Sequence, residues 1–591
     1  MDTKKSKLDF FRRNGVALNA AGLVDEAARF VMTEQYFDRG LWKHCVNQFA
    51  GKNRDDACAD SHDNGWRGEY WGKMMRGAAM TYDYTRDDDL YEILTETVVD
   101  LLNRSDERKS SYAPDCELQD GWDVWCRKYV LLGLLCFRSV CTDNALVKRI
   151  DDAAIRMADC FMQTVGAGKK EIYDTSSVWS GINSSSILEA FVLLYECTGE
   201  QRFLDFAAYI IDSGMIKGAD LVALIEGDTL PYQFPARKAY ELISCVEGLL
   251  EYGLATADRK YVRLAARFAD KILASDFTVV GAVGCEGELL DNAAVTQAER
   301  TEDVKQETCV TVTFMKLLAR LFAVTGEEKY VAAFERSAFN ALYGAVNLQR
   351  NNRNGGLPFD SYSPLIEETR ARAIGGLKVL DWVAINGCCA AIGGAGTALV
   401  PRMLVTARAD GVYFNIYAPC VGDAETDGGV LSFQTETDFP FGGNVSIRFY
   451  AERRDHAAVY LRIPSYVRQF TLIVNGQKRK ATAENGYCKI ESVTDGDVVT
   501  LTLDMDTSIV RRGERFAVER GAIVYAADSR YADPAEAFDP DADFALCEDE
   551  AIAEELLEVY AENDAERPCL VPYWIAGNDW RSAVTVWLRR Q

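Results

Sequence analysis

Histidine is nearly absent from this sequence: only His44, His62 and His456 occur among 591 residues. A Ser-His-Asp hydrolase needs a histidine base, and many metal sites use several imidazole ligands, so both kinds of site are poorly supplied. His62 lies in the loop ACADSHDNGW, where it could contact a ligand, although an ordinary surface role is favoured; His456 falls in a strand-rich region. The chemistry of this chain is therefore expected to rest on other residue types.

Positive charge and long apolar runs are also scarce. Lys and Arg number 65 against 90 Asp and Glu, so the formal net charge is −25. This charge argues against nucleic acid and anionic membrane as partners and leaves room for a neutral or cationic small substrate. No stretch of about 18 uncharged apolar residues occurs, and the basic N-terminus lacks an apolar segment. Neither a membrane span nor a signal peptide is indicated, and a cytoplasmic location is expected.

Nucleotide-binding loops are missing as well. There is no P-loop, and the glycines of IGGAG at 392–396 have no preceding predicted strand and no βαβ context. These glycines are expected to permit close helix packing instead.

Cysteine, in contrast, is plentiful. Seventeen cysteines are scattered along the chain, and several lie in apolar helical runs, such as Cys136 in LLGLLCF and Cys245 in LISCVEGLL. Cysteines in such runs are typical of small buried apolar residues in a reducing compartment.

One cysteine pair has different surroundings. Cys388 and Cys389 stand side by side in INGCCAAIGGAG, among Gly and Asn. Adjacent cysteines seldom bond to each other, so two thiols presented together are a candidate soft-metal site. Glu307 and Cys309, in VKQETCVTV, would complete a tetrahedral zinc set, because zinc accepts thiolate sulfur and carboxylate oxygen.

A weak repeat organises the first two thirds of the chain. Five segments share a Thr, a nearby acidic residue and then an aromatic residue or Leu, each between apolar stretches of helical period; they begin at Thr85, Thr142, Thr198, Thr256 and Thr325. A unit of about 57 residues fits two helices and two connections, and the polar turn residues can cap the next helix. Six such hairpins fit between about residues 20 and 395. They predict an (α/α)6 toroid over 1–400, with an open solenoid as the alternative.

Strand patterns replace this repeat after about residue 402. Segments such as NVSIRFYA, AAVYLRIP and VVTLTLDM alternate with period two, and Asn475-Gly476 and Asp495-Gly496 mark tight hairpins. An antiparallel β-sandwich is predicted over 401–510. Residues 511–591 are predicted to add strands that pack with it. Within them, 528–567 is predicted to be an exposed acidic insertion or interface arm, with a helix in AIAEELLEVYAEN, and it could mediate a homodimer.

Aromatic and charged residues open three of the predicted inner helices. Trp and Tyr faces stack on sugar rings while charged groups bind hydroxyls, so these residues would suit a saccharide pocket, although helix core with capping charges is the alternative reading. The candidate sugar-binding residues are Glu69, Trp71, Trp122, Trp125, Lys128, Tyr129, Tyr240 and Glu241. Two long loops, 281–306 and 348–387, lead into the cysteine motifs. The first carries Glu286 and Glu288, either of which could act as a general acid and base.

The order of a Gly-Glu loop, then ETC, then CC, inside a helical toroid followed by a sandwich, resembles glycoside hydrolase family 127, the β-L-arabinofuranosidases. GEYWGKMMRGAA, YELISCVEGLLEY and LRIPSYV are also similar to that superfamily. The resemblance implies a zinc ion held by Glu307, Cys309, Cys388 and Cys389. It also implies a retaining mechanism on a glycoside or oligosaccharide, with Cys388 as nucleophile and Glu288 as acid and base.

This sequence departs from the family pattern near the sugar. Where the family places histidines at two helix openings, this chain has Lys128-Tyr129 and Lys238–Glu241, and Ala390 replaces the proline after the cysteine pair. The charge of Lys128 would suit an acidic or otherwise modified sugar. Two other functions are kept open: a sugar epimerase or isomerase on the same toroid, and a non-catalytic, zinc-containing carbohydrate-binding protein.

Overall fold

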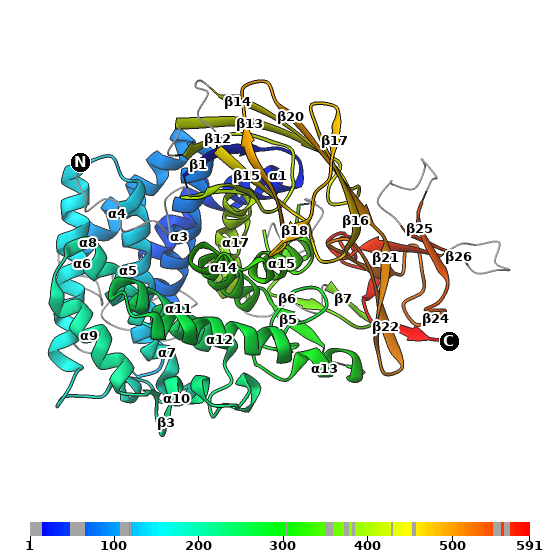
Figure 1. The fold of residues 1–591 in the computed structure, drawn as a ribbon. Helices are drawn as coiled ribbons and strands as arrows, with labels where there is room; N and C mark the ends of the chain where they lie inside the picture. Colours follow the sequence, from blue (N-terminus) through cyan, green and yellow to red (C-terminus); the bar gives the residue numbers. More distant parts are fainter. Residues whose placement is uncertain are drawn as a thin grey trace.

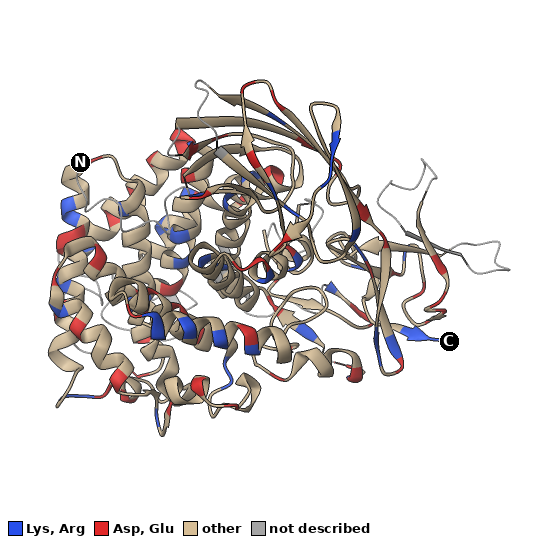
Figure 2. Ribbon diagram, viewed as in Figure 1, with Lys and Arg blue, Asp and Glu red and all other residues tan. Residues whose placement is uncertain are grey.

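The computed structural model describes residues 15–47, 66–106, 118, 120–302, 304–348, 358–370, 377–380, 384–426, 429–451, 457–547, 557–560 and 568–591. Helices form one side of the molecule and strands the other, with the C-terminus among the strands (Figure 1). Lys and Arg are interspersed with Asp and Glu along the ribbon (Figure 2).

Six helices form a closed ring around the centre of the helical part. They are α3 (Trp66–Thr85), α5 (Asp123–Val140), α8 (Leu188–Thr198), α11 (Ala239–Ala255), α14 (Thr308–Thr325) and α17 (Cys388–Leu404). Each packs against the next, and α17 packs back against α3. The predicted toroid is therefore confirmed over the open solenoid. The ring helices are buried on almost every side, and several of them carry buried charged side chains, such as Lys73, Glu189 and Lys316, among their apolar residues.

A second layer surrounds this ring. It contains α4 (Asp88–Asp106), α6 (Asn144–Thr164), α9 (Gln201–Asp212), α12 (Arg259–Ser275) and α15 (Glu328–Arg336), and α1 (Leu23–Val31) packs on α17. All five predicted turns join an inner helix to an outer one. Asp143 and Asp258 accept hydrogen bonds from backbone N–H groups of the helices that follow them, as predicted for N-caps.

Glycines in α17 allow the ring to close tightly. A Cβ on Gly394 would lie 1.8 Å from the Tyr36 hydroxyl, and one on Gly396 would lie 2.8 Å from side-chain atoms of Leu342 and Val312. The predicted role of these glycines in close packing is confirmed. The prediction that no strand precedes these glycines is wrong, because β9 (Ala384–Gly387) pairs with β8 (Leu377–Leu380) and leads directly into α17 at Cys388.

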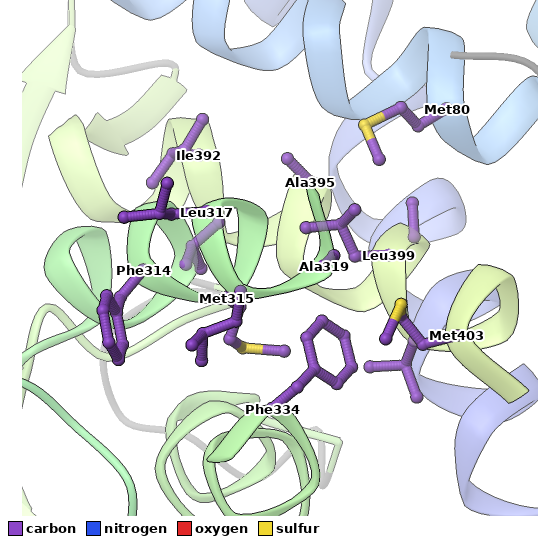
Figure 3. Close-up of a cluster of buried hydrophobic side chains, with 14 of the residues drawn as sticks. Met80, Phe314, Met315, Leu317, Ala319, Phe334, Ile392, Ala395, Leu399 and Met403 are labelled. Carbon is purple, nitrogen blue, oxygen red and sulfur yellow. The ribbon is translucent and has the colours of Figure 1, made fainter. Parts of the chain in front are cut away.

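Apolar side chains of α14 and α17 interlock beside this contact (Figure 3). Phe314, Met315 and Leu317 of α14 are fully buried, and Ile392 and Leu399 of α17 are nearly so. By length and hydropathy, α14 is the one helix among the described residues that could cross a membrane, but 78% of that window is buried inside the protein. It is a core helix of the ring.

The predicted sandwich consists of two sheets. The first has the order β1 (Val16–Ala20), β12 (Cys420–Thr426), β13 (Gly429–Thr437), β14 (Asn444–Ala451), β20 (Val498–Met505), β16 (Val467–Val474) and β17 (Gln477–Arg479). The second has the order β10 (Val405–Arg408), β11 (Gly411–Phe414), β15 (Ala457–Arg462), β19 (Tyr487–Val493) and β18 (Ala483–Glu484). Pairing is antiparallel except between β11 and β15. β1 joins the first sheet, although residues 1–400 are predicted to belong to the toroid.

The C-terminal strands form a third sheet. Its main path is β24 (Ala537–Phe538), β29 (Leu588–Arg590), β22 (Arg515–Arg520), β23 (Ile523–Asp528), β27 (Cys569–Pro572), β26 (Leu557–Tyr560) and β25 (Asp543–Leu546). The predicted helix in AIAEELLEVYAEN is wrong where the structure describes that segment. Residues 557–560 pair instead with β25 and β27, because long-range strand pairing overrides a local helical pattern.

Candidate active site

The two cysteine motifs lie at the openings of neighbouring ring helices. Cys388 and Cys389 begin α17, while Glu307 is the N-cap of α14 and Cys309 lies in its first turn. Because α14 and α17 pack side by side, one ligand atom from each of these four residues lies within 4.8 Å of the other three. The predicted meeting of the four residues is confirmed.

The spacing of these atoms fits zinc. A tetrahedral site with zinc–sulfur bonds of about 2.3 Å has sulfur–sulfur edges of about 3.8 Å and slightly shorter sulfur–oxygen edges. The Cys388 and Cys389 sulfurs are 3.8 Å apart, and Glu307 Oε1 lies 3.5 Å from Cys389 Sγ and 4.0 Å from Cys388 Sγ. The other Glu307 oxygen is buried without a hydrogen-bond partner. The geometry and the donor set therefore suit a metal ion.

Electrostatics also favour a cation here. Burial, followed by the charge of Cys388, raises the pKa of Glu307 to about 8. Burial also raises the pKa of Cys309 and Cys389, whereas hydrogen bonds from Cys309 and Cys389 lower the pKa of Cys388. Four acidic groups packed this closely cannot all ionise without compensating positive charge, which a dication would supply.

Lys73 places one positive charge behind the cluster. Its buried ammonium donates to Glu69 Oε1 at 2.6 Å and lies 3.8 Å from Cys309 Sγ. Glu69 and Lys73 are four residues apart on α3, so both side chains leave the same face of the helix. Burial raises the pKa of Glu69 to about 7, although Lys73 opposes the rise. This pair fixes a charge at the back of the thiol cluster.

A small sheet brings the Gly-Glu loop to the same place. β4 (Glu286–Gly287) pairs with β5 (Lys305–Glu307), which pairs with β6 (Tyr362–Pro364). Glu288 follows β4, and its carboxylate accepts a hydrogen bond from the Tyr362 hydroxyl at 2.7 Å and contacts the Lys238 ammonium. Tyr362 in turn lies within the electrostatic reach of Glu307 and the three cysteines, and burial raises its pKa.

The Glu286 side chain has different surroundings from those of Glu288. Its side chain is 45% exposed and pairs with Arg300 at 2.8 Å. Of the two carboxylates that the sequence offers, Glu288 is therefore the one joined to residues around the thiols.

An aromatic wall borders the Lys73 side of the cluster. The Trp125 ring makes edge contacts with Tyr129 and Tyr240, at centroid distances of 5.1 Å and 5.3 Å. The Tyr129 hydroxyl donates to the Tyr240 hydroxyl at 2.5 Å, and the Lys73 ammonium lies 4.4 Å from the Tyr240 ring centre. Three predicted sugar-binding aromatics thus meet, with their faces oriented by a buried cation.

Lys128 and Glu241 complete this wall. Lys128 is buried, with its ammonium 3.3 Å from Ser186 Oγ and 4.5 Å from the Trp125 ring centre. One oxygen of Glu241 is buried without a partner. Burial raises the pKa of Glu241, against the effects of Lys238, Lys73 and Lys128. Glu241 therefore lies within the charged surroundings of the cluster, since its charge acts on Glu307, whereas the charges that act on Lys128 are those of Glu189, Glu247 and Lys316.

Two predicted residues lie elsewhere. The Trp71 indole N–H donates to Thr97 Oγ1 of α4 at 3.1 Å, so this ring packs between the two helical layers. Trp122 precedes α5 and makes an edge contact with Trp125, at the outer end of the wall. His62 and His456 lie outside the described residues, and half-buried His44 lies on α2 (Arg39–Asn47).

Comparison with known proteins identifies the family. The model of the β-L-arabinofuranosidase GH127 catalytic domain matches residues 26–354, and that of the GH127 middle domain matches residues 411–505. The chain belongs to glycoside hydrolase family 127. As a GH127 member it is a glycoside hydrolase, and the predicted family is confirmed.

Individual relatives agree with this placement. A non-reducing-end β-L-arabinofuranosidase of Bifidobacterium longum subsp. longum is 23% identical over 512 residues, which cover 77% of this chain and 74% of the relative. Among solved structures, a GH127 β-L-arabinofuranosidase of Geobacillus stearothermophilus T6 aligns with a TM-score of 0.73 at 16% identity, covering 97% of this chain and all of the other. A second GH127 β-arabinofuranosidase has a TM-score of 0.74 at 19% identity, covering 98% and 97% of the two chains. These structures share the fold of the GH127 chain described here.

Sequence reasoning missed Lys73 and Tyr362. The Glu69–Lys73 spacing was available as a signal, since both side chains share a helix face. Tyr362 carries no comparable signal, because the pairing of β5 with β6 alone brings it to Glu288.

The buried charge of Lys128 has a measurable cost. Burial lowers its pKa from 10.5 to about 8. Between pH 8 and 10.5 the folded state loses this proton while the unfolded state keeps it, so stability rises with pH across that window. Below pH 8 the buried, charged ammonium lowers the free energy of unfolding. Lys128→Met should therefore raise the free energy of unfolding at pH 7, by up to roughly 3 kcal/mol.

Urea unfolding of both proteins at pH 7 and pH 10 measures this effect. The advantage of Lys128→Met should shrink at pH 10, where the wild-type lysine is largely neutral in the folded state. Ser139→Ala, on the half-buried end of α5, provides a control variant with no change of charge. A destabilised Lys128→Met would instead show that Lys128 stabilises its acidic neighbours.

Proposed function

We propose that this chain is a zinc-dependent, retaining exo-glycosidase that uses Cys388 as nucleophile and Glu288 as acid and base, with β-L-arabinofuranosides as substrates. The observation that carries the proposal is the convergence of Glu307, Cys309 and the cysteine pair at the openings of two ring helices. The substrate class comes from the family and from the Bifidobacterium relative, which is named for non-reducing-end β-L-arabinofuranosidase activity.

The three thiols are not equivalent. Cys309 is 2% exposed and Cys389 is fully buried, whereas Cys388 is only half-buried. Cys388 also has the lowered pKa of the three, which favours the thiolate form needed for attack. Bound zinc would add a Lewis acid that keeps these cysteines deprotonated at neutral pH. Cys388 is thus proposed as ligand and nucleophile, and Cys389 as ligand alone.

The proposed reaction has two steps. The Cys388 sulfur attacks the anomeric carbon as the glycosidic bond breaks, and Glu288 gives its proton to the departing oxygen. This leaves a thioglycosyl-enzyme and the Glu288 carboxylate. Glu288 then takes a proton from water, whose oxygen attacks the same carbon and releases the Cys388 thiolate. Two inversions give net retention.

Residues around Glu288 suit this exchange of a proton. The Tyr362 hydroxyl and the Lys238 ammonium both contact its carboxylate and restrain its position. The aromatic wall of Trp125, Tyr129 and Tyr240 would border the sugar. A pocket enclosed by a closed ring favours removal of terminal sugars from short, imported oligosaccharides over cleavage within a polymer.

The two alternative functions receive less support. Epimerases on this type of toroid generally use catalytic histidines, and the one histidine among the described residues, His44, lies on α2, outside the six ring helices. A purely structural zinc site would not require Glu288 to be held beside it by two polar side chains. Turnover by the wild-type protein on a panel of aryl glycosides, including arabinofuranosides of both anomers and uronides, separates these functions.

Metal removal tests the zinc assignment. Purified reduced protein should contain about one zinc per chain by elemental analysis. Treatment with 1,10-phenanthroline should abolish turnover and lower Tm by more than about 5 °C, because four acidic ligands then repel one another. Added zinc should restore both properties.

Cys309→Ser is the matched ligand variant for this test, because the proposed mechanism gives Cys309 no contact with the sugar. It should lose most of its zinc, and chelation should change it little further. Full activity in protein that contains no zinc would contradict the assignment.

A further inference from the structure

The loop at residues 176–181 holds a tryptophan in an unfavourable backbone conformation. Trp179, Ser180 and Gly181 all have left-handed φ values, of 50°, 55° and 75°. Glycine adopts this conformation easily, but a bulky residue such as Trp does so at an energetic cost. Strained residues of this kind persist only where their surroundings enforce them, and they concentrate at functional sites.

Both ends of this loop are anchored. The Asp120 carboxylate accepts hydrogen bonds from the Ser177 backbone N–H at 2.7 Å and from the Ser177 hydroxyl at 2.6 Å. The Ser180 carbonyl accepts from the Lys217 N–H at 2.9 Å. A Cβ on Gly181 would lie 2.1 Å from the Tyr173 carbonyl oxygen, so the turn is also tightly packed. These contacts impose the conformation of Trp179.

The anchored loop leaves the indole partly open to solvent. Trp179 is 38% exposed, more than any other tryptophan that the structure describes. A ring that served only to fill the core would be turned inward, and a smaller residue would accept the left-handed backbone at lower cost. The loop therefore maintains an exposed aromatic surface at a fixed position.

That surface adjoins the acid/base side of the candidate active site. The Lys238 ammonium lies 5.5 Å from the Trp179 ring centre, within the range of a cation–π contact. The same ammonium contacts the Glu288 carboxylate. Lys238 is itself buried, so it links the exposed indole to the carboxylate at a defined distance.

The position of the ring relative to Glu288 indicates its partner. A general acid must lie next to the oxygen that joins the cleaved sugar to its leaving group. The thiols lie on the other side of the anomeric carbon in an in-line displacement. An exposed ring whose cationic partner directly contacts the acid therefore borders the leaving group.

We propose that Trp179 is a stacking platform for a sugar ring in the leaving group, and that Lys238 orients the indole while contacting Glu288. This inference rests on the proposed hydrolase function. With such a platform, the enzyme should prefer glycosides whose leaving group contains a sugar ring over simple alkyl glycosides. The apolar face of a sugar ring would pack on the exposed indole face.

Two substrates with the same cleaved sugar test the platform. Methyl β-L-arabinofuranoside has no ring in its leaving group, whereas a β-L-arabinofuranosyl-L-arabinose disaccharide has one. Trp179→Ala should lower kcat/KM for the disaccharide about tenfold and for the methyl glycoside by less than about twofold. Trp179→Phe, which keeps a smaller ring, should fall between wild type and Trp179→Ala on the disaccharide.

Tyr450→Ala is the matched control, because Tyr450 is a similarly exposed aromatic, at 44%, on β14 of the sandwich. It should leave both substrates unaffected. Equal losses on the two substrates would show a structural role for Trp179, and an unchanged rate on the disaccharide would show no role; either result overturns the proposal.

Binding separates this inference from the proposed function. If the wild-type protein cleaves neither substrate, the hydrolase assignment on arabinofuranosides fails, and calorimetric titration with the same disaccharide tests the platform alone. Trp179→Ala should then weaken disaccharide binding about tenfold. Equal affinity of the two proteins, or no binding by wild type, would overturn the platform.

Discussion

Replacing Cys388 with serine should lower kcat/KM by about 10⁴-fold or more, because a serine hydroxyl is a far weaker nucleophile than a thiolate at neutral pH. The serine keeps the shape of the side chain and an oxygen that can remain near the metal ligands. Zinc content and Tm should therefore fall much less than turnover does. Steady-state kinetics with an aryl β-L-arabinofuranoside, elemental analysis and thermal unfolding on the same samples give the three quantities.

Two other cysteine variants make this result specific. Cys389→Ser should lose zinc, stability and turnover together, because Cys389 is fully buried and is proposed to act only as a ligand. Cys141→Ser, at the C-cap of α5 and outside the cluster, should behave like wild type. If Cys388→Ser lost turnover only in proportion to its zinc, Cys388 would be a structural ligand and the nucleophile would have to be sought elsewhere.

The architecture could be predicted from local signals in the sequence. A Thr with a nearby acidic residue marks each helix-to-helix turn, because its side chain and its neighbours satisfy the free N–H groups at the start of the next helix. Thr198 and Thr325, for example, each accept a hydrogen bond from the N–H two residues on, at 3.2 Å. Five such turns at similar spacing sufficed to predict a toroid.

Strand partners could not be predicted in the same way. β1 pairs with β12, some 400 positions further along the chain, and residues 557–560 form a strand because β25 and β27 flank them. A short segment with a mixed pattern takes the conformation that its neighbours in space impose. Those neighbours are not visible in a single sequence.

The residues of the candidate site fall into the same two groups, those that local sequence signals predict and those that depend on contacts between distant segments. The meeting of Glu307, Cys309, Cys388 and Cys389 could be predicted because these residue types together are chemically distinctive as a candidate metal site. Tyr362 and Trp179 could not, since their roles depend on the β5–β6 pairing and on an anchor between Asp120 and Ser177. The sequence alone also leaves open whether Glu286 or Glu288 is the acid and base. Only the folded chain distinguishes them, because Glu286 is exposed and pairs with Arg300, whereas Glu288 contacts Tyr362 and Lys238.

Glu288→Gln should lower kcat by about 10²- to 10⁴-fold on glycosides with poor leaving groups, because the amide can neither give a proton to the leaving oxygen nor take one from water. It should also remove the limb of the pH–rate profile that reports the acid. With a 2,4-dinitrophenyl glycoside the first step needs no proton, so the thioglycosyl-enzyme should accumulate. Intact-mass spectrometry would then detect one added sugar on the protein, and peptide mapping would locate it at Cys388.

Glu286→Gln is the matched control, two residues away on the same loop. Its carboxylate is exposed and paired with Arg300, so its loss should change kcat by no more than about twofold. The reverse pattern, with Glu286→Gln inactive and Glu288→Gln active, would mean that the loop moves on binding substrate and exchanges the two carboxylates. Equal activity of both variants would show that this loop takes no part in the chemistry. The proton would then have to come from another acid near the thiols, and Glu69, which Lys73 links to Cys309, would be the next variant to test.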